Sequence, residues 1–568
     1  MRKYAIFGLA SIVLLAILVR LLPLERYFFW GVDTGEYYGI THSLFAGGHL
    51  DPVNYKGFGF TYPYFPGIYF VIASSSLVTS LDLLFVFSVV IPVIGALSAF
   101  LVFFISREIF TDIRASLVSS LFVAVVVIHY YQTSRTMPAT LGHFLLLLCI
   151  LLLLKAYDSR KYFVLLVPAT LALVFTHHLS AYFLLAASVG IFIYREFLKR
   201  KSDYISGANT AYVLFLAGTI MLYWFLYVTP FIDFVVAPAL KFSPLLLPAL
   251  LYAGIAILVL MVIARRKAKW AYVPRYRGFR WNAALFLTAL ALSVSIFLAA
   301  TFLGLSGAPV DDKTGMLIFL PVVIIVGFVG VGISYADFNR KGFAAYGCLV
   351  ALGLSFLAVL ALNSHEIFPD RHVEILIVVI GLLAGYGFVK FFQLRSDASS
   401  FSARFGVIAV LLILFSSMAF TAYPSTQILG GAEQGTYQKD IDGVFWAREN
   451  VALEPNSVIA AENRLSSDLY GVAGFNATWY SARDTFYAPN FSGARGEMLS
   501  CECPSGTKRV DYIFMDDATI KNALLVPWEP HRGITGDALG KFDGFQYAKI
   551  FDNGYCRIYM VVNWTAAA

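Results

Sequence analysis

Long apolar runs separated by short polar segments dominate the first 422 residues. Runs of roughly 17–25 apolar residues are long enough to cross a bilayer as helices. The chain is therefore predicted to be a polytopic α-helical membrane protein with about 13 spans. We place these spans near residues 5–24, 84–106, 115–132, 138–157, 162–177, 180–194, 211–230, 246–264, 283–303, 316–335, 344–362, 373–393 and 405–422.

Two regions depart from this pattern. Residues 25–83 form a long polar loop after the first span, and within it residues 66–80 are apolar but short, which predicts an interfacial or re-entrant helix. If residues 66–80 cross the membrane, the topology after them inverts.

After residue 422 the membrane-length runs stop, and residues 423–568 are predicted to be a small α/β domain. Val444–Asn450 is expected to be a helix. Ser457–Ala461 and Val510–Met515 are expected to be buried strands, and Asp552–Gly554 is a hairpin turn signal.

Composition supports the membrane class. Of 568 residues 59% are apolar and 14% are charged, and the mean hydropathy is +0.74. The net charge is +12 over residues 1–422 and −5 over residues 423–568, so the basic excess belongs to membrane flanks and does not indicate nucleic-acid binding. No small-residue cleavage site follows the first apolar run, which is therefore interpreted as an uncleaved span.

Lysine and arginine predict the orientation. With the N-terminus in the cytoplasm, the inner loops and flanks hold 23 basic residues, including the run Arg265–Lys269, and the outer ones hold seven up to residue 422. Because basic residues are retained on the cytoplasmic side, this bias predicts a multi-pass protein of the cell membrane. The loop 25–83 and the domain 423–568 are then extracytoplasmic.

The last region also contains Cys501, Cys503 and Cys556, and three glycosylation sequons at Asn476, Asn490 and Asn563. Both features suit an external domain, with one disulfide joining Cys556 to Cys501 or Cys503. A Cys-x-Cys metal site is the less favoured alternative, because no nearby histidine completes a ligand set.

Asp33 and Glu36 form an acid pair just after the first span, one helical turn apart. Two compatible interpretations remain open. Asp33 and Glu36 are a capping box that starts a helix, or Asp33 is a general base and its neighbour orients it or helps to hold a divalent ion.

Several basic side chains are predicted on the same side of the membrane. Arg371 precedes a span and can bind a lipid phosphate in a forked geometry, although an ion pair with Asp370, Glu366 or Glu374 is the alternative. Arg135 has the same two interpretations. Further candidates for substrate contact are His372 and His178, and the candidates for a metal site are Asp33, His143 and His177.

These features resemble the GT-C superfamily of polyprenyl-phosphate-dependent glycosyltransferases, which includes oligosaccharyltransferases, protein O-mannosyltransferases and aminoarabinose transferases. The resemblance rests on the layout and on short motifs. The motifs are Asp33-Thr-Gly-Glu36, Gly47-Gly-His-Leu50, Tyr62-Pro-Tyr-Phe-Pro-Gly67, and Phe445-Trp-Ala-Arg-Glu-Asn450 followed by Asn456-Ser-Val-Ile-Ala-Ala461, which is similar to archaeal relatives. It implies that Asp33 is the catalytic acid and that Arg371 contacts the lipid phosphate.

Two family motifs are absent. Glu462–Gly471 stands where oligosaccharyltransferases carry Trp-Trp-Asp-Tyr-Gly, and residues 133–137 lack their second acidic motif. The resemblance therefore favours transfer of a single sugar from a polyprenyl (dolichyl) phosphate to an external protein, glycan or lipid. It leaves open whether a divalent cation, Mg²⁺ or Mn²⁺, takes part.

Three alternatives remain. A transporter or flippase for a lipid-linked or acidic solute is less favoured, because no internal repeat is evident and charged groups cluster at the predicted outer ends of the spans. The other two are an oligosaccharyltransferase-like enzyme without the usual acceptor motif, and a non-catalytic binding or assembly protein.

Overall fold

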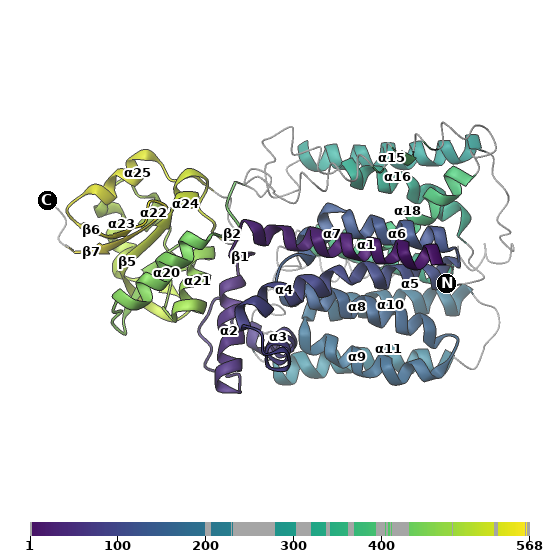
Figure 1. Cartoon of the computed structure of the whole chain (residues 1–568), viewed down its shortest axis with the longest axis horizontal. Helices are drawn as coiled ribbons and strands as arrows, with labels where there is room; N and C mark the ends of the chain where they lie inside the picture. The colour runs from purple at the N-terminus through teal and green to yellow at the C-terminus, as the bar shows by residue number, and fades with distance from the viewer. Residues whose placement is uncertain are drawn as a thin grey trace.

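The computed structural model shows a helical bundle with a small α/β unit at one end (Figure 1). It describes residues 3–198, 206–228, 230, 279–302, 320–336, 341–361, 369–393, 404, 407–408, 411, 431–479, 481–526, 532–562 and 564. The predicted span 246–264, most of the span 405–422, the proposed boundary near residue 423 and the sequon residue Asn563 lie outside these residues.

The bundle is built from helices that coincide with the predicted spans wherever the residues are described. Its helices are α1 (Lys3–Leu21), α4 (Leu83–Ala96), α5 (Ser98–Phe110), α6 (Ile113–Val125), α7 (Val127–Thr133), α8 (Pro138–Ala156), α9 (Phe163–Thr176), α10 (His178–Leu198), α11 (Ser206–Leu222), α15 (Phe279–Phe302), α16 (Leu320–Tyr335), α17 (Gly342–Ala361) and α18 (Pro369–Gln393).

Six helical stretches of the described residues are long and apolar enough to cross a membrane. The number rises to seven if α6 and α7, bent by 63° relative to each other, make one span. The described residues therefore support six or seven of the thirteen predicted spans. Helix α3 (Gly67–Thr79) has 13 residues, fewer than the roughly 20 that a spanning helix needs, as expected for an interfacial or re-entrant helix.

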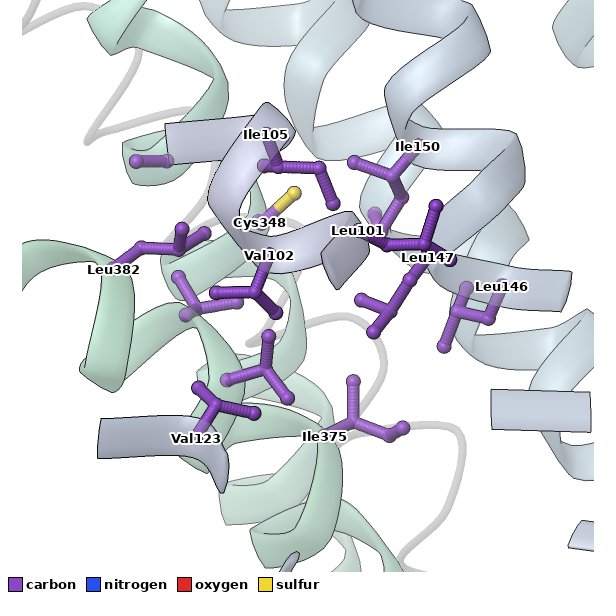
Figure 2. Close-up of a cluster of buried hydrophobic side chains, with 14 of the residues drawn as sticks. Leu101, Val102, Ile105, Val123, Leu146, Leu147, Ile150, Cys348, Ile375 and Leu382 are labelled. Atoms are coloured by element: carbon purple, nitrogen blue, oxygen red, sulfur yellow. The ribbon is translucent and has the colours of Figure 1, made fainter. Parts of the chain in front are cut away.

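The bundle packs through apolar side chains and close helix contacts. Figure 2 shows side chains of α5, α6, α8, α17 and α18 meeting in one cluster that includes Leu147, Cys348 and Ile375. Gly190 of α10 and Gly347 of α17 bring two backbones together, which is how small residues allow helices to associate in lipid.

The first loop folds against the C-terminal unit. Strand β1 (Phe29–Trp30) pairs antiparallel with β2 (Gly435–Thr436), with Trp30 opposite Gly435. Helix α2 (Thr34–Gly47) follows β1, and the loop then passes through the short 3₁₀ helix η2 (Tyr62–Tyr64) into α3. Figure 1 shows β1, β2 and α2 at the junction of bundle and α/β unit.

The C-terminal unit is a mixed sheet covered by helices. The strand order is β3–β5–β7–β6, with β3 parallel to β5, the other pairs antiparallel, and β4 paired to the start of β5. The elements are α20 (Gln438–Asn450), β3 (Ser457–Ala460), α21 (Asn463–Ala473), α22 (Arg483–Tyr487), α23 (Phe491–Leu499), β4 (Cys501–Cys503), β5 (Gly506–Asp516), α24 (Asp517–Lys521), α25 (Gly536–Gly540), β6 (Tyr547–Asp552) and β7 (Cys556–Val561). The predicted helix, strands and hairpin are confirmed.

The predicted disulfide is wrong, because Cys501, Cys503 and Cys556 are all free thiols. The strand register explains the error. Cys501 lies opposite Lys508 near the start of β5, whereas Cys556 lies opposite Asp516 at its end, eight residues further along. That separation is about 27 Å along a strand, and a disulfide needs Cα atoms within about 7 Å.

Helices α2 and α21 touch backbone to backbone. A Cβ atom on Gly471 would collide with the carbonyl of Gly35, and one on Gly39 would collide with Gly471. The amide of Glu36 donates to Ser467 Oγ at 2.8 Å across the same contact. Glycine is needed here because any side chain would force the helices apart.

We expect Gly471→Ala to destabilise the full-length protein by about 1–3 kcal/mol, as overpacked cores do. Gly496→Ala in α23 is the matched control, because a Cβ there meets no atom within 4 Å. Thermal unfolding in detergent should show a lower midpoint for the first variant and an unchanged or higher midpoint for the second. Equal midpoints would contradict the close contact.

Candidate functional site

Asp33 lies at the N-terminus of α2, partly exposed, where the first loop meets the C-terminal unit. Tyr62 Oη donates to Asp33 Oδ2 at 3.0 Å. Burial raises the pKa of the Asp33 carboxyl, while hydrogen bonds from Tyr62 and Asn463 and the nearby guanidinium groups of Arg135 and Arg371 act in the opposite direction. The carboxylate therefore sits among donors and positive charges, with a proton affinity above its ordinary value.

Glu36 does not form the expected capping box. Asp33 is the N-cap residue of α2, but its side chain makes no capping hydrogen bond. Glu36 is fully buried, and its Oε1 accepts hydrogen bonds from Tyr55 Oη at 2.6 Å and from the Gly59 amide at 2.9 Å. The carboxyl is drawn into the loop that folds back over α2, so it anchors residues 55–59 rather than the start of the helix.

Arg371 and Arg135 both interact electrostatically with Asp33, and they come from different parts of the bundle. Arg371 lies near the start of α18, and its NH1 donates to Gln132 Oε1 at 2.7 Å. Of the three acids predicted as ion-pair partners of Arg371, Glu374 is the one observed, with its Oε2 at 3.7 Å from Arg371 NH1. Glu366 lies outside the described residues, and nothing is described of the Asp370 side chain. The predicted ion pair of Arg371 with Glu374 is thus present, and the same arginine also interacts electrostatically with Asp33.

Arg135 lies in the connection between α7 and α8. Its guanidinium stacks on the ring of Tyr131, 3.9 Å from the centroid, and lies 5.5 Å from the Trp30 centroid. Its NH2 donates to Gln434 Oε1, and so does the Tyr131 hydroxyl. Gln434 directly precedes β2, so the C-terminal unit helps to fix this arginine.

The histidine candidates His177 and His178 are ring neighbours, with centroids 5.1 Å apart, and each candidate has a different hydrogen-bond or packing partner. His177 Nδ1 contacts Ser180 Oγ at 2.9 Å, and the His178 ring packs 5.2 Å from Phe65. His372 is buried and its Nε2 contacts Ser355 Oγ at 2.9 Å. His143 is buried too, and its Nε2 lies 3.0 Å from His129 Nε2.

A divalent cation does not fit the residues around Asp33. Among the described residues, no group of three or more His, Cys, Asp or Glu side chains comes together as a metal-ligand set. The charged neighbours of Asp33 include Glu36 and the guanidinium groups of Arg135 and Arg371, and the two guanidinium groups repel a cation. We therefore derive no chemical step through a metal ion.

Several residues of the site were not singled out from the sequence. Tyr62 belongs to the motif Tyr62–Gly67, but the sequence gives it no role of its own. Gln132, Gln434 and Asn463 have no sequence signal that marks them as site residues. Amide side chains carry no sequence pattern of their own, and Gln434 and Asn463 follow Gln132 by about 300 residues. The strand pair β1–β2 and the contact of α2 with α21 bring Gln434 and Asn463 to the first loop.

The arrangement combines two chemical capacities. A carboxylate whose pKa is raised by burial is a stronger base than an exposed carboxylate, which suits it to accept a proton. Two arginines beside it can bind and stabilise an anion, with planar forks suited to phosphate oxygens.

Comparison with protein-family models and with curated proteins gives no match. Solved structures do match over nearly the whole chain. The oligosaccharyltransferase AglB from Archaeoglobus fulgidus, in complex with an inhibitory peptide and a dolichol-phosphate, is 16% identical with a TM-score of 0.53, covering 91% of this chain and 69% of that chain. The Archaeoglobus fulgidus oligosaccharyltransferase tethered to an acceptor peptide containing the NVT sequon is 17% identical with a TM-score of 0.55 and the same coverage.

ArnT from Cupriavidus metallidurans, bound to undecaprenyl phosphate, is 12% identical with a TM-score of 0.52. The match covers 100% of this chain and 99% of that chain. The chain is thus structurally similar to GT-C glycosyltransferases along almost its whole length. At these identities the similarity establishes the fold of a multi-pass membrane protein, and the residue roles remain to be argued.

We expect Glu36→Gln to flatten the dependence of stability on pH. Burial raises the pKa of Glu36 from 4.5 to about 8, and the negative charge of Asp33 adds to the rise. A folded-state pKa above the unfolded value means that this group stabilises the fold fully below about pH 4.5 and that the contribution is lost as pH rises through 8.

Thermal midpoints measured between pH 4 and 9 test this. The wild type should lose more stability over this window than Glu36→Gln does, and Asp51→Asn, at an exposed position of the same loop, should follow the wild type. Parallel curves for the wild type and Glu36→Gln would show that folding does not shift the pKa of Glu36.

Proposed function

We propose that the protein is a membrane glycosyltransferase that moves a sugar from a polyprenyl (dolichyl) phosphate to an acceptor outside the cytoplasm. The observation that carries the proposal is the grouping of Asp33, Arg135 and Arg371, a proton acceptor beside two phosphate-binding groups. It is supported by the fold shared with an oligosaccharyltransferase bound to dolichol-phosphate and with ArnT bound to undecaprenyl phosphate.

The proposed reaction needs a base and an anion site. The acceptor heteroatom attacks the anomeric carbon of the sugar, and the bond from that carbon to the phosphate oxygen breaks. The bonding electrons leave with the lipid phosphate, where Arg371 stabilises the charge, while Asp33 takes the acceptor proton or positions the group that does. Arg135 lies close enough to Asp33 to assist from the other side.

The topology proposed from the basic residues fits this chemistry. With the N-terminus in the cytoplasm, Asp33 and the C-terminal unit lie outside, where lipid-linked sugars meet extracytoplasmic proteins, glycans or lipids. Glu36 acts indirectly by fixing the loop above Asp33, and His178 and His372 remain further candidates for substrate contact. Protein glycosylation in an archaeal cell is the setting that the motif resemblance favours.

We expect Asp33→Asn to lower sugar transfer by about 10²–10⁴-fold, the usual contribution of a general base. The assay offers purified full-length protein a panel of polyprenyl-phosphate sugars and measures both lipid phosphate release and sugar transfer. Asp51→Asn is the control, because Asp51 lies exposed in the same loop and hydrogen-bonds within that loop, to Asn54. Full activity of a folded Asp33→Asn variant would remove Asp33 from the mechanism.

We also expect transfer to persist after treatment with a chelator. The two guanidinium groups beside Asp33 supply positive charge where a cation would otherwise act. Activity is measured with EDTA and again after adding back Mg²⁺ or Mn²⁺. A loss with EDTA that either ion restores would establish a metal requirement and show that further ligands complete the site.

A further inference from the structure

A line of buried polar side chains crosses the bundle beneath Arg371. It joins Arg20 of α1, His129 of α7, His143 of α8 and Glu374 of α18, each 4% exposed or less. Arg20 NH2 lies 2.9 Å from His129 Nδ1, and His129 Nε2 lies 3.0 Å from His143 Nε2. His143 Nδ1 then lies 3.6 Å from Glu374 Oε1.

Arg20 sets the direction of this line. A guanidinium only donates hydrogen bonds, so His129 Nδ1 accepts and the proton of this neutral ring is on Nε2. His129 Nε2 therefore donates to His143 Nε2, and the proton of His143 is on Nδ1, facing the carboxylate. Every donor along the line points from the fixed positive charge of Arg20 towards Glu374.

Glu374 divides its two oxygens between this line and the candidate site. Oε1 faces His143, and Oε2 lies 3.7 Å from Arg371 NH1. Both separations are longer than a hydrogen bond and short enough for charge interaction. The Nδ1–H of His143 and the guanidinium of Arg371 together stabilise the negative charge of the buried Glu374 carboxylate. Without them, burial of this charge would cost free energy.

The charge of the lipid changes during the proposed reaction. A polyprenyl-phosphate sugar is a phosphodiester with one negative charge, whereas the lipid phosphate released is a monoester with about 1.5 to 2 charges at pH 7. An isolated arginine would therefore hold the product more tightly than the donor. A fixed carboxylate beside that arginine repels the more highly charged product more strongly.

We propose that Glu374 is an internal counter-ion that competes with the lipid phosphate for Arg371 and so limits how tightly the site retains its product. The proposal rests on the proposed function, and it assigns Glu374 a positioning role through Arg371 rather than contact with the reacting atoms. Arg20, His129 and His143 keep the carboxylate in place from the far side.

The test measures binding of undecaprenyl phosphate to full-length protein in detergent, with undecaprenol as the uncharged comparison. Glu374→Gln and Glu374→Met remove the charge and should tighten undecaprenyl phosphate binding by about tenfold or more, which corresponds to about 1.4 kcal/mol, without changing undecaprenol binding. Steady-state turnover should fall together with KM, because product release slows.

Glu108→Gln is the matched control. Glu108 is a carboxylate of the same bundle, held between Lys155 and Lys341 at 2.7 Å each, and it is expected to leave lipid phosphate affinity unchanged. A merely structural role of Glu374 would weaken binding when the residue is replaced, so unchanged or weaker binding in both neutral variants would overturn the inference.

Arg371→Gln separates this inference from the proposed function. If Arg371→Gln weakens undecaprenyl phosphate binding while neither Glu374 variant tightens it, the counter-ion role alone is overturned. If Arg371→Gln leaves binding unchanged, the phosphate does not sit at Arg371, and both the proposed phosphate site and the counter-ion role fail.

Discussion

The contact between α2 and α21 is the constraint on which the candidate site depends. Because Gly35, Gly39 and Gly471 have no side chains, the two backbones touch, and the start of the C-terminal unit lies directly on the first loop. This closeness lets Asn463 reach Asp33, while Gln434, just before β2, reaches Arg135. The site is thus assembled from two parts of the chain: the first loop and the bundle supply its charged groups, and the C-terminal unit supplies the amides of Gln434 and Asn463.

The bundle supports this site with an ordered change from polar to apolar side chains. In α8, His143 precedes Leu146, Leu147 and Ile150, and in α18, Arg371 and Glu374 precede Ile375 and Leu382. In these two helices His143, Arg371 and Glu374 lie near the N-terminal end, and the apolar residues of the cluster follow them. Tight apolar packing below holds the charged groups above at fixed separations.

Local sequence patterns predicted much of the fold. The features that they did not predict depend on contacts between residues far apart in the sequence. The spans, the helix α20, strand β3 and the β6–β7 hairpin have signals within a few residues, and Asp33 and Arg371 were expected at one site from the predicted topology. The disulfide failed because the sequence does not give strand register. The capping box failed because the loop returns to bind Glu36. Arg20 and His129 were missed because each lies in an apolar run and their separation of 109 residues hides their contact.

The pairing of β1 with β2 affects when the candidate site can form during synthesis. The two strands are separated by about 400 residues, so the first loop cannot adopt its final conformation until nearly the whole chain has left the ribosome. At about 5–20 residues per second this delay is roughly 20 to 80 seconds. A chain that ended between Arg371 and Gln434 would contain Asp33 and Arg371 but neither Gln434 nor Asn463. The complete site therefore forms only after the C-terminal unit has been synthesised.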